Sequence, residues 1–445
     1  MEKMPSSRAM WLFTNPWLED ENGKLDHSCG FSIERFRALH VQLIAQYFKP
    51  ETVGSGVWIH QLATDLVALG HQVSVVTSFP NYPKRIVFDG YRGRLFMREQ
   101  MDGVDVVRTY IYASPNEGML SRTLNYGSFC ASAAIGGLFE PKPDVIYCVM
   151  PPMPLGAVAA FLGWVKSAPV VVNIQDIYPD IAVAVGVLRN PLMIRFFEWM
   201  ERFIYRKAAS IVVIADGFKE NIVGKGVPEE KVHVVPNWAD PDEIQPGPKD
   251  NPFRRQVGVG DRFTLSYSGS LSYNTNLDPV LDAAKLLADE DFSFVIVGDG
   301  VKKVELERRA QELGLNNLQF LPFQPLERYP QVLAASDMNL VTLNQQAAMA
   351  SVPSKMFKMM ASGRPVLAIT MEGNEVHRLI HDSDCGLTVP PDDPVKLAEA
   401  LRYAASHPEE MERMGRNART YLVEKHARRD CVGMIEAILR KAAGS

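Results

Sequence analysis

Apolar residues along most of this chain fall into short runs, separated by longer stretches in which they recur every three or four positions. Short apolar runs are typical of buried strands, and the longer period is typical of helices. From Leu39 onward, residues 40–48 predict a strand, residues 57–71 a helix that ends near Gly70, and residues 72–79 a second strand. This order of elements is the βαβ unit of a parallel sheet.

The alternation continues through two consecutive series of elements. The first series has further expected strands at residues 105–111, 143–150, 169–174 and 209–216. The second has expected strands at 263–269, 292–300, 318–323, 338–343 and 365–370, and expected helices at 277–289, 304–314 and from about Pro353. We therefore predict an α/β protein with two Rossmann-like, doubly wound parallel-sheet domains that face each other across a cleft.

The domain boundaries follow from breaks in this pattern. We interpret residues 1–38 as a flexible or loosely docked extension, because they mix polar and aromatic residues without a period; the alternative is that translation starts further on. A Pro-rich stretch at 236–248 suits a hinge. We therefore assign residues 39–238 to the N-terminal domain and 239–420 to the C-terminal domain. Residues 421–445 predict a helix that crosses back to the first domain.

The composition limits the classes of function. The chain has 445 residues, 47% hydrophobic and 22% charged, which is ordinary for a folded protein of two or three domains. A net charge of −5 gives no reason to expect nucleic-acid binding. Five scattered cysteines indicate a reducing, cytoplasmic setting without a disulfide framework or zinc site.

No part of the sequence predicts a signal peptide or a membrane-spanning helix. The first residues lack an apolar core behind a basic start. The longest apolar candidate, Pro154 to Val165, has roughly a dozen residues, against the ~20 that a bilayer requires. We therefore expect any membrane association to be peripheral.

Residues 351–369 contain a candidate anion site. Ser351 is an expected cap, Pro353 suits an early helical position, and Gly363 suits the helix end. The free amides and dipole at the start of such a helix, with Ser354 and Lys355, form a cradle for a diphosphate. An ordinary capped helix with a solvated lysine remains the alternative.

Two glycine-containing turns at strand ends are further candidates for phosphate approach. In residues 266–276, Ser268, Gly269 and Ser270 follow a strand. In residues 295–300, Gly298 and Gly300 flank Asp299, but the spacing falls short of a complete dinucleotide fingerprint. For the first of these segments, a plain strand-to-helix turn remains the simpler alternative.

The first half offers two candidates of its own. The segment Gly54-Ser55-Gly56 opens a helix and is expected either to hold the transferring phosphate or to let an acceptor approach closely. Asp176 follows the strand at 169–174, so its carboxylate is expected to face the cleft and orient an acceptor hydroxyl. The alternative is that Asp176 caps the following helix.

A series of motifs from Leu39 to the C-terminus resembles family 4 glycosyltransferases of the GT-B fold. In chain order, the motifs are YFKPETVGSG, GHQVSVVTSFPNYP, DIYPD, PNWAD, YSGSL, FVIVGDG, FLPFQPLERYPQVLAASDMNLVTL, VPSK, SGRPVLA and CGLTVPPDDP. The likeness is to the subgroup that assembles O-antigen, colanic acid and capsule, including WbuB-like fucosamine transferases and their fucosyl relatives. It implies an enzyme that transfers sugar with retention from a UDP- or GDP-linked donor to a lipid-linked saccharide.

The resemblance also implies roles for individual residues. Ser354 and Lys355 would hold the donor phosphates, the backbone around Phe323 would read the nucleotide base, and Glu375 would lie beside the donor. The turns would complete the donor site with Ser268, Gly269, Ser270, Gly298, Asp299 and Gly300. Gly54, Ser55, Gly56 and Asp176 would form the acceptor side. We expect Asp176, Lys355 and Glu375 to take part in catalysis.

The sequence departs from the family pattern at several positions. The two glutamates of a Glu-x7-Glu motif are replaced by Ala350 and Lys358, as is common in this subgroup. Gln175 stands where other members have a histidine, and no basic residue follows the turn after Tyr267. These departures leave Lys355 as the main expected cation for the diphosphate.

The expected chemistry is the departure of a diphosphate whose charge is stabilised by a helix dipole and a cation. The sequence contains no cluster of metal ligands, so we expect no cofactor and no bound divalent ion. Two other functions remain open. One is a nucleotide-sugar 2-epimerase of the same fold, and the other is a non-catalytic nucleotide-sugar-binding partner. An NAD-dependent oxidoreductase is disfavoured by the missing fingerprint.

Two stretches are candidates for contact with an anionic membrane surface. Lys84 to Arg98 and Pro191 to Lys207 both interleave basic residues with aromatic or aliphatic ones. For the second stretch, the simpler interpretation is a partly buried helix.

Overall fold

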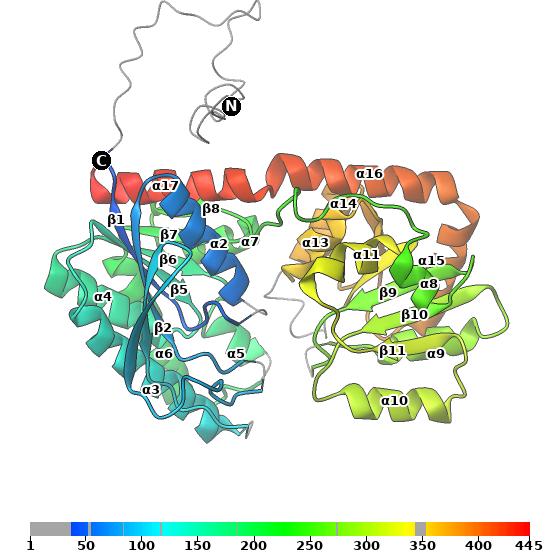
Figure 1. Ribbon diagram of the computed structural model, residues 1–445, viewed down its shortest axis with the longest axis horizontal. Coiled ribbons are helices and arrows are strands. Elements are labelled where there is room, and N and C mark those ends of the chain that lie inside the picture. Colours follow the sequence, from blue (N-terminus) through cyan, green and yellow to red (C-terminus); the bar gives the residue numbers. More distant parts are fainter. Residues whose placement is uncertain are drawn as a thin grey trace, which may run out of the picture. The chain divides into compact units, whose positions relative to one another are not determined.

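The computed structural model describes residues 37–51, 55–82, 84–115, 118–184, 186–272, 275–342 and 353–445. It contains two separate, largely parallel sheets with helices packed against them, as the alternation of apolar patterns predicts (Figure 1). The predicted α/β fold class with two doubly wound halves is therefore confirmed.

The first sheet has eight strands in the order β3-β4-β2-β1-β5-β6-β7-β8. They are β1 (His40–Ile44), β2 (Gln72–Ser78), β3 (Phe96–Met101), β4 (Val104–Thr109), β5 (Val145–Met150), β6 (Val170–Ile174), β7 (Ser210–Val213) and β8 (Val232–Val234). Its helices are α2 (Ser55–Ala68), α3 (Met119–Leu138), α4 (Pro154–Lys166), α5 (Asp180–Ala184), α6 (Pro191–Lys207) and α7 (Asp216–Gly224).

The second sheet has six parallel strands in the order β11-β10-β9-β12-β13-β14. They are β9 (Phe263–Ser268), β10 (Phe292–Val297), β11 (Leu318–Leu321), β12 (Met338–Thr342), β13 (Val366–Ile369) and β14 (Gly386–Val389). Its helices are α8 (Pro252–Val257), α9 (Asp278–Leu286), α10 (Lys303–Glu312), α11 (Tyr329–Ala334), α13 (Lys355–Ala361), α14 (Glu375–Ser383) and α15 (Pro394–Ser406).

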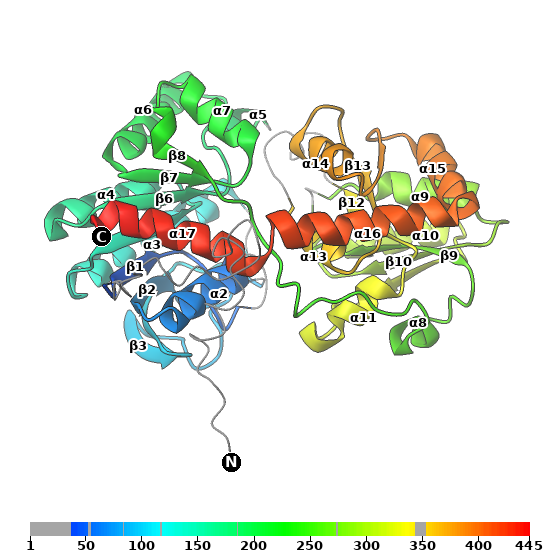
Figure 2. The ribbon, with the colours of Figure 1, turned by 90° about the horizontal axis from the view of Figure 1, so that it is seen from above.

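Two long helices close the chain, α16 (Pro408–Lys425) and α17 (Arg428–Ala443). Helix α16 packs against α13 and α14 of the second half, whereas α17 packs against α2, β5 and β6 of the first (Figure 2). The buried face of α17, which includes Val432, Ile435 and Leu439, belongs to the same apolar core as β1 and β2. The chain therefore does return to the first half.

Burial explains why the central strands are nearly continuous apolar runs. Strands β5, β6 and β10 are buried at every position, as expected for parallel strands covered on both faces. The strand predicted at 40–48 is shorter and ends at Ile44. The helix expected from about Pro353 begins only at Lys355.

The structure also contains an edge strand that the sequence analysis did not predict. Strand β3 pairs antiparallel with β4, and its residues alternate between exposed and half-buried. An edge strand with one solvated face has no continuous apolar run, so a search for buried strands misses it.

Candidate active site

The predicted donor residues lie together at one edge of the second sheet. The turn 268–270 follows β9, the loop 298–300 follows β10, and Phe323 follows β11. Glu375 follows β13, and Lys355 begins the helix between β12 and β13. Because these strands are parallel, all of these positions lie at the carboxyl ends of the strands, where open α/β sheets bind ligands.

The two glycine-containing turns pack directly against each other. The Gly269 amide donates to the Val297 carbonyl at 2.9 Å, and the Leu271 amide donates to the Asp299 carbonyl at 2.9 Å. A side chain at Gly298 would collide with the carbonyl oxygen of Gly269, and one at Gly300 would collide with the backbone of Leu271. These two glycines are therefore needed for contact between the turns, and their role toward a donor stays a prediction.

Lys355 lies against the same pair of turns. Its Nζ is 3.9 Å from the centre of the Tyr267 ring, and a Cβ at Gly269 would lie 3.3 Å from it. The Tyr267 hydroxyl donates to the Ser270 carbonyl at 2.8 Å, which fixes the ring beneath the ammonium group. Among the described residues, no carboxylate lies within ion-pair distance of Lys355.

The helix that carries Lys355 differs from the predicted cradle. Helix α13 has seven residues, and Ser354 is at its N-cap position with an exposed side chain that makes no capping bond. The expected cap Ser351 and the family position Ala350 lie outside the described residues. The short helix makes Lys355 itself, rather than a long helix dipole, the main positive charge here.

Lys358 lies one turn further along α13. Its Nζ is 5.7 Å from the centre of the Tyr329 ring, and burial lowers the pKa of its ammonium group. Where many relatives carry a glutamate, this chain therefore has a half-buried cation on an aromatic ring.

Phe323 and Glu375 differ in their surroundings. Phe323 is 45% exposed, so its ring is accessible to a ligand. Glu375 instead accepts a hydrogen bond from the Gly217 amide of α7 at 3.2 Å and lies 3.4 Å from Arg378. Burial raises the pKa of Glu375. This carboxylate therefore connects the second half to the start of a helix of the first half.

On the predicted acceptor side, Gly54 lies outside the described residues, and Ser55 begins α2. Gly56 packs closely on the preceding loop, because a Cβ there would lie 3.3 Å from the Glu51 carbonyl oxygen and 3.4 Å from the Phe48 amide nitrogen. The glycine at position 56 is thus needed for local packing.

Asp176 follows β6 and lines a small pocket together with Met150, Tyr178, Glu201 and Tyr205. Burial raises the pKa of Asp176 to about 7. Helix α5 begins only at Asp180, and no described residue donates a hydrogen bond to the Asp176 carboxylate. The alternative that Asp176 caps the following helix is therefore not what the structure contains.

The sequence analysis missed the buried carboxylate that shapes this loop region. Glu51 accepts hydrogen bonds from the amides of Asn81 and Tyr82 at 2.9 and 2.8 Å, and burial raises its pKa. It thereby ties the loop after β1 to the loop after β2. The signal in the sequence is a lone acid three residues after the apolar run at 40–48.

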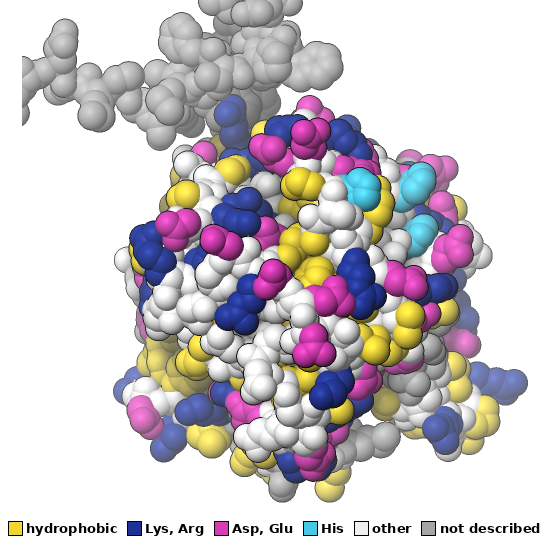
Figure 3. Space-filling model, turned by 90° about the vertical axis from the view of Figure 1, so that its right-hand side faces the viewer, with side chains coloured by type: hydrophobic (Ala, Val, Ile, Leu, Met, Phe, Trp, Pro, Cys, Tyr) yellow, Lys and Arg dark blue, Asp and Glu magenta, His cyan; other side chains and the backbone are white. Residues whose placement is uncertain are grey.

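Within the described parts of the chain, no group of three side chains is arranged to hold a metal ion, and no helix is long and apolar enough to span a membrane. On the face of the second half drawn in Figure 3, described side chains of both charges are interspersed. Of the two candidate surface stretches, 84–98 leads into β3 and exposes Leu95, and 191–207 forms α6.

Comparisons with known proteins identify the family of the chain. Residues 53–238 match the family described as glycosyl transferase 4-like domain, and residues 249–421 match glycosyl transferases group 1. The putative colanic acid biosynthesis glycosyl transferase WcaI of Escherichia coli K12 is 30% identical over 324 residues, which is 71% of this chain and 79% of that protein. The probable glycosyltransferase WbjE of Pseudomonas aeruginosa is 29% identical over 52% of this chain and 58% of its own.

Solved structures show the same fold. HepE from Anabaena in complex with UDP-glucose has a TM-score of 0.67 at 17% identity, covering 91% of this chain and 100% of that one. WaaG, a glycosyltransferase involved in lipopolysaccharide biosynthesis, has a TM-score of 0.64 at 17% identity, with coverage of 91% and 100%. The chain therefore belongs to the family 4-like, group 1 glycosyltransferases of polysaccharide biosynthesis and has their two-domain GT-B fold.

Proposed function

We propose that this glycosyltransferase moves a sugar from a UDP- or GDP-linked donor to a lipid-linked saccharide, with retention of the anomeric configuration. The observation that carries the proposal is the position of Lys355. Its ammonium group lies on the Tyr267 ring beside the turn 268–270, and no carboxylate of the described residues neutralises it. A cation held in this way at the ligand-binding edge of a sheet is suited to a diphosphate.

Each half of the molecule has a part in the proposed reaction. In the second half, Lys355 and the amides of the turn 268–270 stabilise the negative charge that develops on the departing diphosphate. In the first half, the Asp176 carboxylate accepts a hydrogen bond from the acceptor hydroxyl and orients it. The hydroxyl attacks on the face from which the diphosphate departs, which gives retention. The UDP-glucose bound to HepE supports a nucleotide-sugar donor.

The surface of α6 supports a lipid-linked acceptor at the membrane. Its side chains Glu201, Ile204 and Tyr205 are buried, while Leu192 is 73% and Trp199 is 52% exposed. The rings of Phe196, Trp199 and Phe203 stack in a row with centroid distances of 6.1 and 6.0 Å. The helix ends in Arg206 and Lys207. An apolar, aromatic face with a basic C-terminal end suits peripheral contact with the anionic cytoplasmic leaflet.

A thermal-shift series tests the donor half of the proposal. The purified protein is heated with UDP-, GDP-, ADP- and CMP-sugars and with NAD, because specific binding raises the melting temperature. We expect a rise with one nucleotide sugar that is lost in Lys355→Ala and kept in Lys249→Ala. Lys249 is a matched control, because its ammonium group is already paired with Asp337 at 2.7 Å. A rise with NAD alone, or with none of the compounds, would contradict the proposal.

A further inference from the structure

A chain of residue contacts connects the acceptor loop of the first half to the donor helix of the second. It consists of Gln175, Asn237, His426 and Phe357. Gln175 directly precedes Asp176, and Phe357 lies on α13, two residues after Lys355. Asn237 and His426 lie at the two places where the chain passes between the halves. We call these four residues the hinge relay.

The first-half end of the hinge relay is a pair of amide hydrogen bonds. Gln175 Nε2 donates to Asn173 Oδ1 at 2.7 Å, and Gln175 Oε1 accepts from Asn237 Nδ2 at 2.8 Å. Both ends of this side chain are therefore occupied by protein partners. Asn173 and Asn237 are buried, so the geometry of Gln175 is well defined.

The second-half end of the relay is the buried ring of His426. Its Nδ1 is 3.2 Å from the Asn237 carbonyl oxygen, and because a carbonyl only accepts, Nδ1 carries the proton. The ring stacks on Phe357 with centroids 4.4 Å apart and an interplanar angle of 26°. One side chain thus bonds to the linker with its edge and packs on the donor helix with its face.

Backbone contacts show that the two chain crossings meet at this point. Ala239 and Ala427 form an isolated parallel bridge. Arg428 binds both carboxylate oxygens of Asp65 on α2 at 2.8 Å and Asp240 at 3.0 Å, so residues up to 240 are fastened to the first half.

The linker beyond residue 240 is fastened to the second half. Arg419 donates to the carbonyls of Pro241, Ile244 and Ala361, the last of which ends α13. The change of attachment therefore falls between Asp240 and Pro241, beside His426.

From this arrangement we propose that Gln175, Asn237 and His426 are positioning residues that set Asp176 relative to Lys355. The inference rests on the proposed transfer reaction, in which the acceptor hydroxyl and the diphosphate must lie on one face of the sugar. A shift of about 1 Å in such an arrangement can cost up to roughly 100-fold in rate. Gln175 acts here through Asn237 and Asn173, without contact with the sugar.

Two substitutions at His426 separate its two contacts. His426→Phe keeps the ring on Phe357 and removes the bond to Asn237, whereas His426→Asn supplies an amide in place of Nδ1 and removes the ring. His407→Phe is the matched control, because His407 also has Nδ1 bonded to a carbonyl, at 2.9 Å, and a ring stacked at 4.1 Å on Tyr403, but it is exposed.

We expect His426→Phe and Gln175→Ala each to lower kcat about 10-fold, with the donor KM changed less than about 2-fold, because donor contacts remain. The kcat of His426→Asn should lie between that of His426→Phe and that of the wild type. The double variant should cost little more than either single one, because both break the same relay. Unchanged kcat in folded His426→Phe, or fully multiplicative losses, would overturn the proposal. So would a lower melting temperature without a kinetic effect.

Measuring the distance between the two halves tests the hinge relay independently of catalysis. Spin labels at the exposed positions Lys142 and Gln311 report on the two halves. We expect the distribution of label distances to broaden in His426→Phe and to stay as in the wild type in His407→Phe. Identical distributions in both variants would contradict the relay. Absence of transfer by the wild-type protein would contradict the proposed function alone.

Discussion

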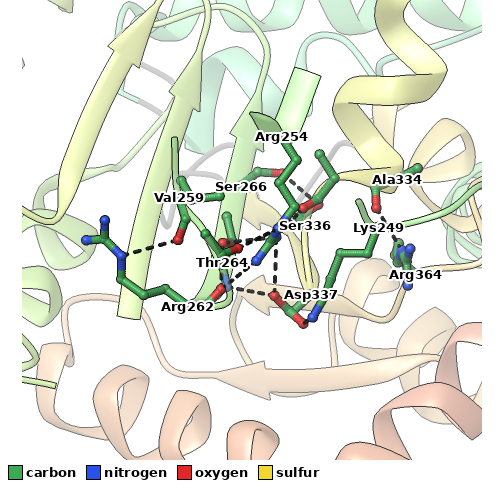
Figure 4. Close-up of polar contacts among 12 residues, drawn as sticks. Lys249, Arg254, Val259, Arg262, Thr264, Ser266, Ala334, Ser336, Asp337 and Arg364 are labelled. Atoms are coloured by element: carbon green, nitrogen blue, oxygen red, sulfur yellow. Dashed lines mark hydrogen bonds and ion pairs between the residues drawn. The ribbon is translucent and has the colours of Figure 1, made fainter. Parts of the chain in front are cut away.

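A basic side chain at the amino edge of the second sheet differs from one at the carboxyl edge in its bonding partners. At the amino ends of β9 and β12, Arg254 is buried and donates hydrogen bonds from all three of its guanidinium nitrogens (Figure 4). At the carboxyl ends of the same sheet, Lys355 rests on a ring without a carboxylate partner among the described residues. The same kind of charge therefore holds the chain together at one edge and is left available for a ligand at the other.

The cluster at the amino edge consists of the hydrogen bonds around Arg254 and Asp337. Arg254 donates to the carbonyls of Gly260 and Arg262 at 3.0 and 2.8 Å, and also to Thr264 Oγ1 and the Ala335 carbonyl. Nearby, Asp337 accepts from the Thr264 amide at 2.9 Å and from Lys249 at 2.7 Å (Figure 4). Such a network uses these charged groups for bonds within the protein and fixes the strand ends.

The largest expected effect is on folding. Arg254→Met should lower the free energy of unfolding by about 3–5 kcal/mol, because it leaves several buried carbonyl groups without a hydrogen-bond donor. Urea unfolding measures this loss. The neighbouring Arg255→Met is the control, since Arg255 is exposed and paired only with Asp250. A loss below about 1 kcal/mol for Arg254→Met would contradict the structural role of this edge.

The next largest effect is on catalysis. Lys355→Met should lower kcat about 10²–10³-fold, because the developing charge of the diphosphate loses its cation. The free energy of unfolding should stay within about 0.5 kcal/mol of the wild type, because no described carboxylate loses an ion-pair partner when Lys355 is replaced. Steady-state kinetics and urea unfolding measure the two quantities. If Lys355→Met were destabilised but fully active when folded, Lys355 would have a structural role, and the contrast with Arg254 would be wrong.

A smaller effect concerns pH. The pKa of Asp176 is raised to about 7 by burial, so activity that needs the carboxylate should rise with pH through about 7. The folded state holds the Asp176 proton more tightly than the unfolded chain, so stability should fall as pH rises from about 4 to about 7. Asp176→Asn should flatten both profiles. Asp180→Asn is the control, because that carboxylate is already bonded to Lys225; equal profiles in both variants would contradict the assignment.

The smallest expected effect is on stability and concerns Lys249 at the amino edge. Lys249 is partly exposed, and its ion pair with Asp337 adds to a carboxylate that Arg254 and Thr264 already surround. Lys249→Met should therefore cost at most about 1 kcal/mol in urea unfolding and leave kcat unchanged. A catalytic loss here would show that the two edges are not independent.

The sequence predicts the fold well because periodicity reports local structure and burial. The runs at β5, β6 and β10 are buried throughout, and their carboxyl ends locate the turns 268–270 and 298–300. The same pattern misses β3, whose exposed edge has no apolar run.

Contacts between distant residues were beyond sequence reasoning. Glu375 meets the Gly217 amide, and Gln175 meets Asn237 next to His426, although these residues are far apart along the chain. Gly298 and Gly300 are predicted donor positions, and their packing of one turn against another is a second role that only the structure shows. Such contacts depend on the tertiary packing of helices and linkers, which a local sequence pattern does not predict.

The most direct test of the central claim measures both products of the reaction. Purified protein is incubated with the nucleotide sugar that stabilises it and with lipid-linked saccharide in vesicles. Released nucleoside diphosphate and glycosylated lipid are quantified, and the new anomeric centre is assigned by NMR. The account predicts that one diphosphate is released per sugar transferred, only with acceptor present, and that the configuration of the donor is kept. Diphosphate release without a glycosylated product, conversion of the free nucleotide sugar at C2, or an inverted linkage would contradict it.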